Sequence, residues 1–164
     1  MMTESINIYI LTGPIKTGKT TSIINWSSAK TNVSGIAQPI LGKKRYLLDL
    51  ASNEKRILEV GLAEKNFVQV GKYRFSKKAF EWAKICLLYS AKRKSDWIIV
   101  DEVGKLELEN KGLEPVITFL IDDCIINKKY NLLFIVRDSL LRSFINKYNL
   151  TELNYKIISG PDEL

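Results

Sequence analysis

The sequence contains no histidine and only two cysteines among its 164 residues. Without histidine, the chain cannot build a Ser-His-Asp triad or a Cys-His nucleophile pair. Two cysteines without histidine also fall short of an ordinary zinc site. Cys86 and Cys124 each lie inside an apolar helical pattern, which predicts core thiols in a reducing compartment. Any acid–base chemistry is therefore left to carboxylates, lysines and tyrosines.

Long hydrophobic runs are also missing. No apolar run approaches the ~18 residues that a membrane-spanning helix needs. Residues 1–7 are polar and include Glu4, which is unlike a secretory signal. Hydrophobic residues make up 46% of the chain and charged residues 26%, as in ordinary soluble globular proteins. We therefore expect a cytoplasmic protein with no membrane partner, folded as one domain over residues 1–164.

The net charge of +7 favours polyanionic partners, and nucleotides and nucleic acids are the candidates. The densest basic cluster, residues 92–94, is predicted to end a helix, where cations interact favourably with the helix dipole. No Lys/Arg block is long enough to form a basic tail. The charge therefore gives a nucleic-acid partner only weak support, and nothing in the sequence specifies an oligomeric state.

Buried apolar runs alternate with helical patterns along the chain. Runs typical of strands cover residues 6–13, 33–40, 96–102, 131–138 and 155–159. Helical patterns cover residues 20–29, 76–93, 114–126 and 140–148. A β-hairpin is predicted near residues 44–60, and extended chain at residues 67–75. This alternation predicts an α/β fold with a mostly parallel sheet and helices on both faces.

The stretch LTGPIKTGKTTS, residues 11–22, follows the first predicted strand and fits the pattern G-x-x-x-x-G-K-[ST]. In such a phosphate loop the backbone N–H groups surround the phosphates, the lysine reaches the β- and γ-phosphates, and the next hydroxyl binds Mg²⁺. The helix that follows points its positive end at the anion. We therefore predict Mg²⁺ as the cofactor. The predicted nucleotide-binding residues are Gly13, Pro14, Ile15, Lys16, Thr17, Gly18, Lys19, Thr20 and Thr21.

A later apolar strand ends in two acids, within WIIVDEVGKLEL at residues 97–108. An aspartate at this place meets the Mg²⁺ of a phosphate loop directly or through water, so Asp101 joins Thr20 as a predicted metal ligand. Glu102 can orient and deprotonate a water that attacks the γ-phosphate. Hydrolysis needs only a placed water, whereas a kinase needs an acceptor site as well. The Asp-Glu pair therefore favours hydrolysis.

Charge on the γ-phosphate in the transition state usually needs a further cation. Lys105 is one candidate, because it follows the two acids through the flexible Gly104. Arg137 is another, because it ends a predicted strand at the edge where parallel sheets bind ligands. The predicted catalytic set is therefore Glu102, Lys19, Lys105 and Arg137.

The pair GPIKTGKTT and DEVGKLEL resembles the small P-loop nucleoside-triphosphatase family, the one that includes the animal cancer-related nucleoside-triphosphatase. Residues 101–108 match the family signature Asp-Glu-[Ile/Val]-Gly-x-[Met/Leu]-Glu-Leu. Residues 70–73 resemble its Val-Gly-Lys-Tyr segment, and GKKRYLLDLAS resembles its Gly-x-Arg-x-Gly-Phe hairpin in weakened form. Pro14 and Ile15 stand where the family usually has a smaller, glycine-containing pair.

The resemblance implies a RecA-like, additional-strand fold with a catalytic glutamate, in which one strand lies between the two motif strands. It also implies Mg²⁺-dependent hydrolysis of ATP, GTP and other nucleoside triphosphates to diphosphate and phosphate, with broad base specificity. Two alternatives stay open. One is a nucleotide or small-molecule kinase, although the late chain offers only Arg137 and Arg142 for an arginine-rich lid. The other is a nucleotide-controlled binding module.

Overall fold

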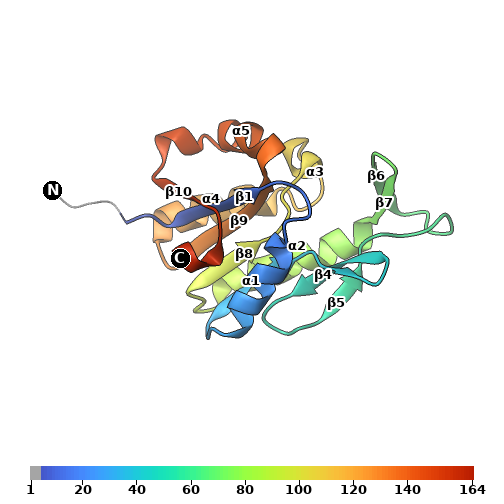
Figure 1. Cartoon of the computed structure of the whole chain (residues 1–164), viewed down its shortest axis with the longest axis horizontal. Coiled ribbons are helices and arrows are strands. Elements are labelled where there is room, and N and C mark those ends of the chain that lie inside the picture. The colour runs from blue at the N-terminus through green and yellow to red at the C-terminus, as the bar shows by residue number, and fades with distance from the viewer. Residues whose placement is uncertain (1–4) are drawn as a thin grey trace.

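A central sheet of eight strands organises the chain, in a computed structural model that describes residues 5–164 (Figure 1). Its order is β10-β1-β9-β8-β2-β4-β3, with β5 paired to β4. Its strands are β1 Ile8–Gly13, β2 Val33–Ala37, β3 Ile40–Leu41, β4 Lys44–Asp49, β5 Lys55–Ile57, β8 Trp97–Val100, β9 Asn131–Arg137 and β10 Tyr155–Ile158. Residues 1–4, part of the polar N-terminal stretch, lie outside the described residues.

The helices lie between the strands in sequence. They are α1 Lys19–Ser28, α2 Lys77–Lys92, α3 Lys105–Leu108, α4 Val116–Asn127 and α5 Asp138–Lys147, with short 3₁₀ turns at Leu150–Glu152 (η1) and Pro161–Glu163 (η2). Within residues 5–164, none of them is both long and apolar enough to cross a membrane. The α/β fold class predicted from the alternating pattern is confirmed.

The strands from β10 to β2 pair in parallel, and β9 lies between β1 and β8. β1 leads into the phosphate loop, and β8 leads into Asp101 and Glu102. The expectation of one strand between the two motif strands is therefore confirmed. Because these strands are parallel, their carboxyl ends meet at one edge of the sheet, where ligands of such folds bind.

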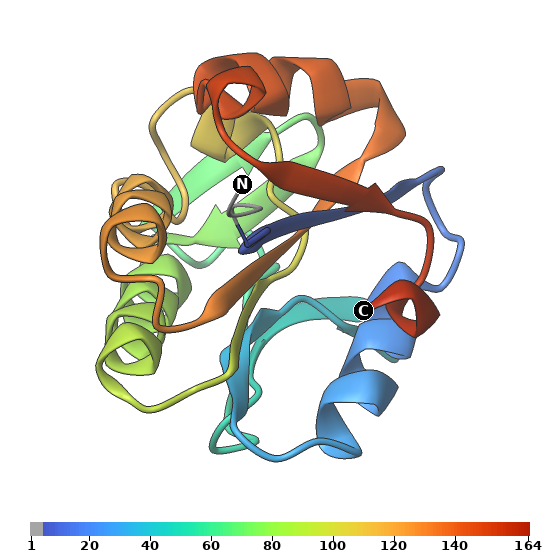
Figure 2. The same cartoon turned by 90° about the vertical axis from the view of Figure 1, so that its left-hand side faces the viewer.

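Helices cover both faces of the sheet (Figure 2). Successive strand residues point to opposite faces, so each strand feeds two cores. In β9, Leu132, Phe134 and Val136 join the larger core beneath α2, α4 and α5. Leu133 and Ile135 join the smaller core beneath α1. Burial on both faces explains why the sequence of β9 reads as an unbroken apolar run.

Two hairpins lie toward the carboxyl end of the parallel strands (Figure 1). β4 and β5 pair antiparallel, which confirms the hairpin predicted near residues 44–60. The chain predicted as extended at residues 67–75 is a second hairpin, formed by β6 Phe67–Val70 and β7 Tyr73–Ser76. β4 also pairs antiparallel with β2, which brings the first hairpin beside the edge where the two motif strands end.

The cysteines are free thiols, with Cys124 buried and Cys86 half-buried. Burial is the largest influence on both thiols and raises the pKa of each to about 11. Neither thiol is therefore activated as a nucleophile.

Candidate active site

The phosphate loop connects β1 to α1 and closes on itself. Gly18, the N-cap of α1, has a φ of +76°, a left-handed conformation that glycine adopts without strain. The Nζ atom of Lys19 donates to the carbonyl oxygen of Gly13 at 3.2 Å, to Oγ1 of Thr17 at 3.1 Å and to the carbonyl oxygen of Pro14. The ammonium group of Lys19 is thus held within the loop by neutral acceptors. A charged phosphate oxygen is a stronger hydrogen-bond acceptor and can replace them.

Thr20 and Asp101, the two predicted metal ligands, contact each other. The hydroxyl of Thr20 donates to Oδ2 of Asp101 at 2.7 Å, and the backbone N–H of Gln38 donates to the same oxygen at 2.9 Å. Asp101 is only 1% exposed, and burial raises its pKa to about 6. Its other oxygen, Oδ1, is buried without a hydrogen-bond partner among the described residues. A buried carboxylate oxygen without a donor is a free position for a cation.

Thr20 and Asp101 suit Mg²⁺, which takes few protein ligands, better than they suit a metal whose ligands all come from the protein. Among the residues that the structure describes, no cluster of three or more His, Cys, Asp or Glu side chains could hold a metal ion. Mg²⁺ usually keeps several waters and takes one or two protein ligands together with substrate phosphates. The hydroxyl of Thr20 and the free oxygen of Asp101 are a donor set of that kind.

Glu102 lies between two arginines from different strands. Its Oε1 atom accepts from Nε of Arg137 at 3.1 Å and from Nη2 at 2.5 Å. Its Oε2 atom lies 3.5 Å from Nη1 of Arg45. The backbone of Glu102 has a φ of +56°, which is uncommon for a residue with a side chain. Strained conformations of this kind cluster at functional sites.

Arg45 is the functional candidate that the sequence analysis missed. It lies on β4, with a side chain 13% exposed. Its guanidinium lies over the ring of Tyr73, with Cζ 5.4 Å from the ring centroid. Its buried Nε atom has no hydrogen-bond partner among residues 5–164. The only sequence signal was the weak likeness of its segment to the Gly-x-Arg hairpin of the resembling family.

A cavity of about 440 Å³ brings most of these groups together. Its polar and charged lining includes Lys16, Thr17, Lys19, Thr20, Thr21, Gln38, Arg45, Asp101, Glu102 and Arg137, and Ile15 and Gly18 also line it. We call it the phosphate cavity. It unites residues of the phosphate loop, α1, β3, β4 and β9 with residues that directly follow β2 and β8 at the carboxyl edge of the sheet.

Three of the predicted site residues lie elsewhere. Gly13 and Pro14 line a separate cavity of about 300 Å³ between the loop and the C-terminal residues Ser159, Gly160 and Pro161. Lys105 is exposed at the start of α3, and it lines a neighbouring cavity rather than the phosphate cavity.

Glu107 shapes the chain that follows the two acids. Its Oε2 atom accepts from the backbone N–H of Gly104 at 2.9 Å, and its Oε1 atom accepts from that of Leu113 at 3.1 Å. Burial raises its pKa to about 7. Glu107 therefore caps the N-terminus of the short helix α3. Hydrophobic periodicity cannot predict this helix, because it has only four residues.

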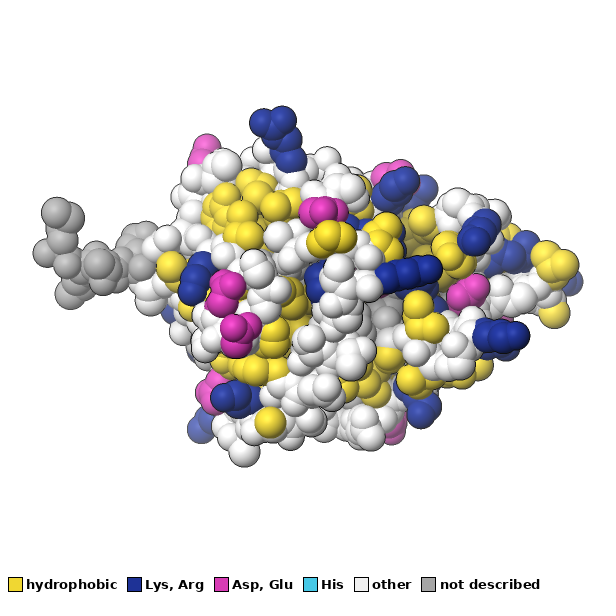
Figure 3. Space-filling view, in the orientation of Figure 1, with side chains coloured by type: hydrophobic (Ala, Val, Ile, Leu, Met, Phe, Trp, Pro, Cys, Tyr) yellow, Lys and Arg dark blue, Asp and Glu magenta, His cyan; other side chains and the backbone are white. Residues whose placement is uncertain are grey.

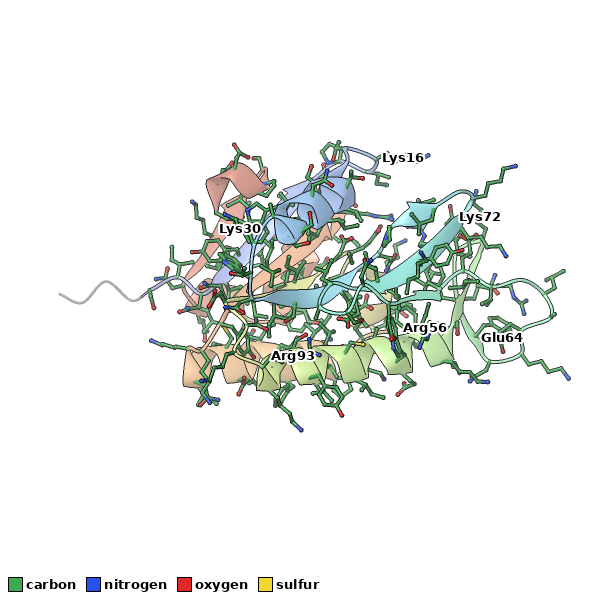
Figure 4. All side chains as sticks on the ribbon, turned by 90° about the horizontal axis from the view of Figure 1, so that it is seen from below. Lys16, Lys30, Arg56, Glu64, Lys72 and Arg93 are labelled. Atoms are coloured by element: carbon green, nitrogen blue, oxygen red, sulfur yellow. The ribbon has the colours of Figure 1, made fainter. Side chains whose placement is uncertain are left out.

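Basic side chains are frequent at the end of the molecule where the two hairpins lie (Figure 3). In Figure 4, Lys16 of the phosphate loop and Lys72 of the β6–β7 turn lie toward this end, whereas Lys30 lies toward the other. A concentration of basic side chains of this kind attracts polyanions.

Comparisons with known proteins identify the family and the fold of the chain. The family model described as NTPase matches residues 8–158. The solved structure described as THEP1 from the hyperthermophile Aquifex aeolicus is similar, with a TM-score of 0.69 and 20% identity, over 95% of this chain and 91% of that one. At this identity the likeness shows the fold. No curated protein matches the chain. The family match spans nearly all of the chain, from β1 to β10, and the chain therefore belongs to the NTPase family.

Proposed function

We propose that the chain hydrolyses nucleoside triphosphates to diphosphate and phosphate with Mg²⁺ as cofactor. Family membership supports nucleoside-triphosphate hydrolysis in general. One observation carries the specific mechanism: residues 15–19 of the phosphate loop, the Thr20–Asp101 pair and Glu102 line a single cavity. We place this activity in the cytoplasm, a setting that suits the two free thiols.

Lys19 and the loop backbone hold the β- and γ-phosphates in this proposal. Lys19 exchanges the carbonyl oxygens of Gly13 and Pro14 for phosphate oxygens, which are charged and therefore stronger acceptors. Thr20 and Asp101 would hold Mg²⁺, which neutralises charge on the phosphates when it is bound. Glu102 orients the attacking water and accepts its proton.

Arg45 and Arg137 supply the cations that the transition state needs. Both line the phosphate cavity, so we assign this role to them in preference to Lys105. In the structure both arginines pair with Glu102. A γ-phosphate carries more negative charge than one carboxylate and competes for the same guanidinium groups. Once they turn to the phosphate, Glu102 is free to act as a base.

We also propose broad base specificity, and the cavity on the other side of the phosphate loop supports it. The cavity lined by Gly13 and Pro14 offers the hydroxyls of Ser22 and Ser159, together with Pro161, for contact with a nucleoside. A hydroxyl can both donate and accept, so it does not distinguish the hydrogen-bonding edges of the bases. We therefore expect ATP and GTP to be used at similar rates.

Phosphate release from ATP, GTP, CTP and UTP, with and without Mg²⁺, tests this function. We expect release with all four in the presence of Mg²⁺, and a loss of about 100-fold or more in kcat for Glu102→Gln, which cannot accept the proton. Glu109→Gln is the matched control, because Glu109 is an exposed glutamate just beyond α3. Release from none of the four would refute the hydrolase. A fully active Glu102→Gln variant would refute the base assignment.

A further inference from the structure

A second cavity of about 410 Å³ lies beside the phosphate cavity. The two share Ile15, Gln38, Arg45, Glu102 and Arg137. Glu102 and its two arginines therefore form a common wall. One face of this wall meets the groups that hold the triphosphate, and the other meets a space that triphosphate binding does not need. We call this space the second cavity.

The β6–β7 hairpin and the start of α2 give the second cavity an aromatic side. The rings of Tyr73 and Phe75 are stacked, with centroids 6.0 Å apart and planes 9° apart. Phe80 meets Phe75 edge-on at 6.4 Å. These rings line the second cavity and not the phosphate cavity. Aromatic side chains that line a cavity are suited to contact with an aromatic group of a ligand.

The remaining lining adds positive charge. Lys105 lines the second cavity, and Arg45 and Arg137 line it as part of the common wall. Glu107 also lines it, but both oxygens of that carboxyl accept backbone hydrogen bonds from Gly104 and Leu113. Because Arg45 and Arg137 are assigned to the γ-phosphate, Lys105 is the cation available to a second ligand. The combination of aromatic rings with Lys105 favours a planar ligand that carries an anionic group.

Hydrolysis alone does not require this space. A single attacking water occupies one hydrogen-bonding position, whereas a cavity of about 410 Å³ falls within the size range of small-molecule sites. Glu102, the proposed base, also lines the second cavity. An alcohol bound there would present its hydroxyl where the water attacks.

We propose that the second cavity binds a phosphoryl acceptor, a planar alcohol with an anionic group, and that the chain transfers the γ-phosphoryl group to it. This proposal rests on the proposed function, because it uses the same nucleotide site and the same base. The hydroxyl oxygen attacks the γ-phosphorus and forms a new O–P bond. The bond between that phosphorus and the β–γ bridging oxygen breaks, and its electron pair leaves with the nucleoside diphosphate. The hydroxyl proton passes to the carboxylate of Glu102 and then to solvent.

The test compares water with three alcohols as acceptors. The full-length chain is given MgATP and equal concentrations of 4-(hydroxymethyl)benzoate, benzyl alcohol or glycerol. ³¹P NMR then measures phosphate ester and free phosphate in one sample. We expect the ester-to-phosphate ratio for 4-(hydroxymethyl)benzoate to exceed that for glycerol about tenfold or more, with benzyl alcohol between them. Because the ratio is internal, it does not depend on how much active protein is present.

Two matched variants test whether the alcohol binds in the second cavity. Ser139 is exposed and lines the second cavity, so Ser139→Phe narrows it. Ser143 is an exposed serine on the same helix, outside both cavities. We expect Ser139→Phe to lower the ratio for 4-(hydroxymethyl)benzoate toward that for glycerol, and Ser143→Phe to leave it at the wild-type value.

The outcomes distinguish the acceptor site from the proposed hydrolase activity. Free phosphate without ester from any of the three alcohols would overturn the acceptor site and leave the hydrolase standing. Equal ratios for the three alcohols, or a Ser139→Phe ratio equal to wild type, would also overturn it. Ester formation without phosphate release in alcohol-free samples would support the acceptor site and refute the hydrolase.

Discussion

Glu102 and Arg137 are paired across the carboxyl ends of β8 and β9, with the Nε and Nη2 atoms of Arg137 3.1 and 2.5 Å from the Oε1 atom of Glu102. The Oε1 atom that accepts these two hydrogen bonds is occupied by the guanidinium, so it is not available to accept the proton of an attacking water. Catalysis therefore depends on where the arginines go when a triphosphate binds.

Removal of either arginine from the common wall should affect the transition state more than nucleotide binding. We expect Arg137→Ala and Arg45→Ala to lower kcat about 100-fold or more, as with other cations that stabilise transferring phosphoryl groups. Trapping of MgADP with aluminium fluoride, a transition-state mimic, should be lost, while binding of MgADP alone is kept. Arg56→Ala is the control, since Arg56 lies on β5, is half exposed and lies over Trp82. Equal loss of MgADP and of the trapped complex would contradict the assignment.

Lys19→Ala should weaken nucleotide binding and hydrolysis together, because Lys19 contacts the phosphates in the ground state as well as in the transition state. We expect the Kd for MgADP, measured by calorimetry, to rise about tenfold or more, equivalent to one charge-assisted hydrogen bond. Lys30→Ala, just beyond the C-terminal end of α1, is the control (Figure 4). A Lys19→Ala variant with wild-type affinity would show that the ammonium stays with the loop carbonyls.

Gly35→Ala should destabilise the pairing of β2 with β8. Gly35 has a φ of +126°, and a Cβ atom there would lie 2.0 Å from the carbonyl oxygen of Ile99. We expect the free energy of unfolding to fall by about 4 kcal/mol or more, measured by urea denaturation. Gly42→Ala is the control for backbone strain alone: Gly42 has a φ of +64° with open space around it, so about 1–2 kcal/mol is expected. Similar losses in the two variants would exclude the overlap with Ile99.

The stability of the chain should carry a pH-dependent contribution from Glu107. Burial raises the pKa of this carboxyl from 4.5 to about 7 in the folded state. The folded state therefore holds the proton more tightly, so this contribution is complete below pH 4.5 and is lost as the pH rises through about 7. Glu107→Gln cannot titrate. The free energy of unfolding of the wild type relative to this variant should fall by on the order of 3 kcal/mol between pH 4.5 and pH 8.5. A difference that does not change with pH would contradict the shift.

The sequence predicts the features of the site that are local in the chain. The phosphate loop has a fixed spacing, and Asp101 with Glu102 follows an apolar strand, so both could be identified without a structure. Arg45 could not, because its place beside Glu102 depends on the antiparallel pairing of β4 with β2. That pairing joins segments whose register no local pattern specifies.

The second cavity escaped the sequence analysis for a similar reason. Tyr73 reads as an ordinary strand aromatic, and only the packing of the β6–β7 hairpin shows which space it faces. Lys105 was predicted to face the phosphate because it follows the two acids closely. The backbone N–H of Gly104 bonds to Glu107, and α3 then begins, so Lys105 faces the second cavity instead.

Position 102 has a left-handed backbone and also carries the proposed base. The residue that best suits the backbone therefore differs from the residue that can accept a proton. Asparagine and glycine suit this backbone but cannot accept the proton of an attacking nucleophile, whereas valine and isoleucine satisfy neither demand. Glutamate therefore occupies position 102 at a conformational cost that asparagine or glycine would reduce. A library of all substitutions at residue 102, sorted once for stability and once for turnover, should therefore give two different rankings, with asparagine and glycine high in the first and inactive in the second.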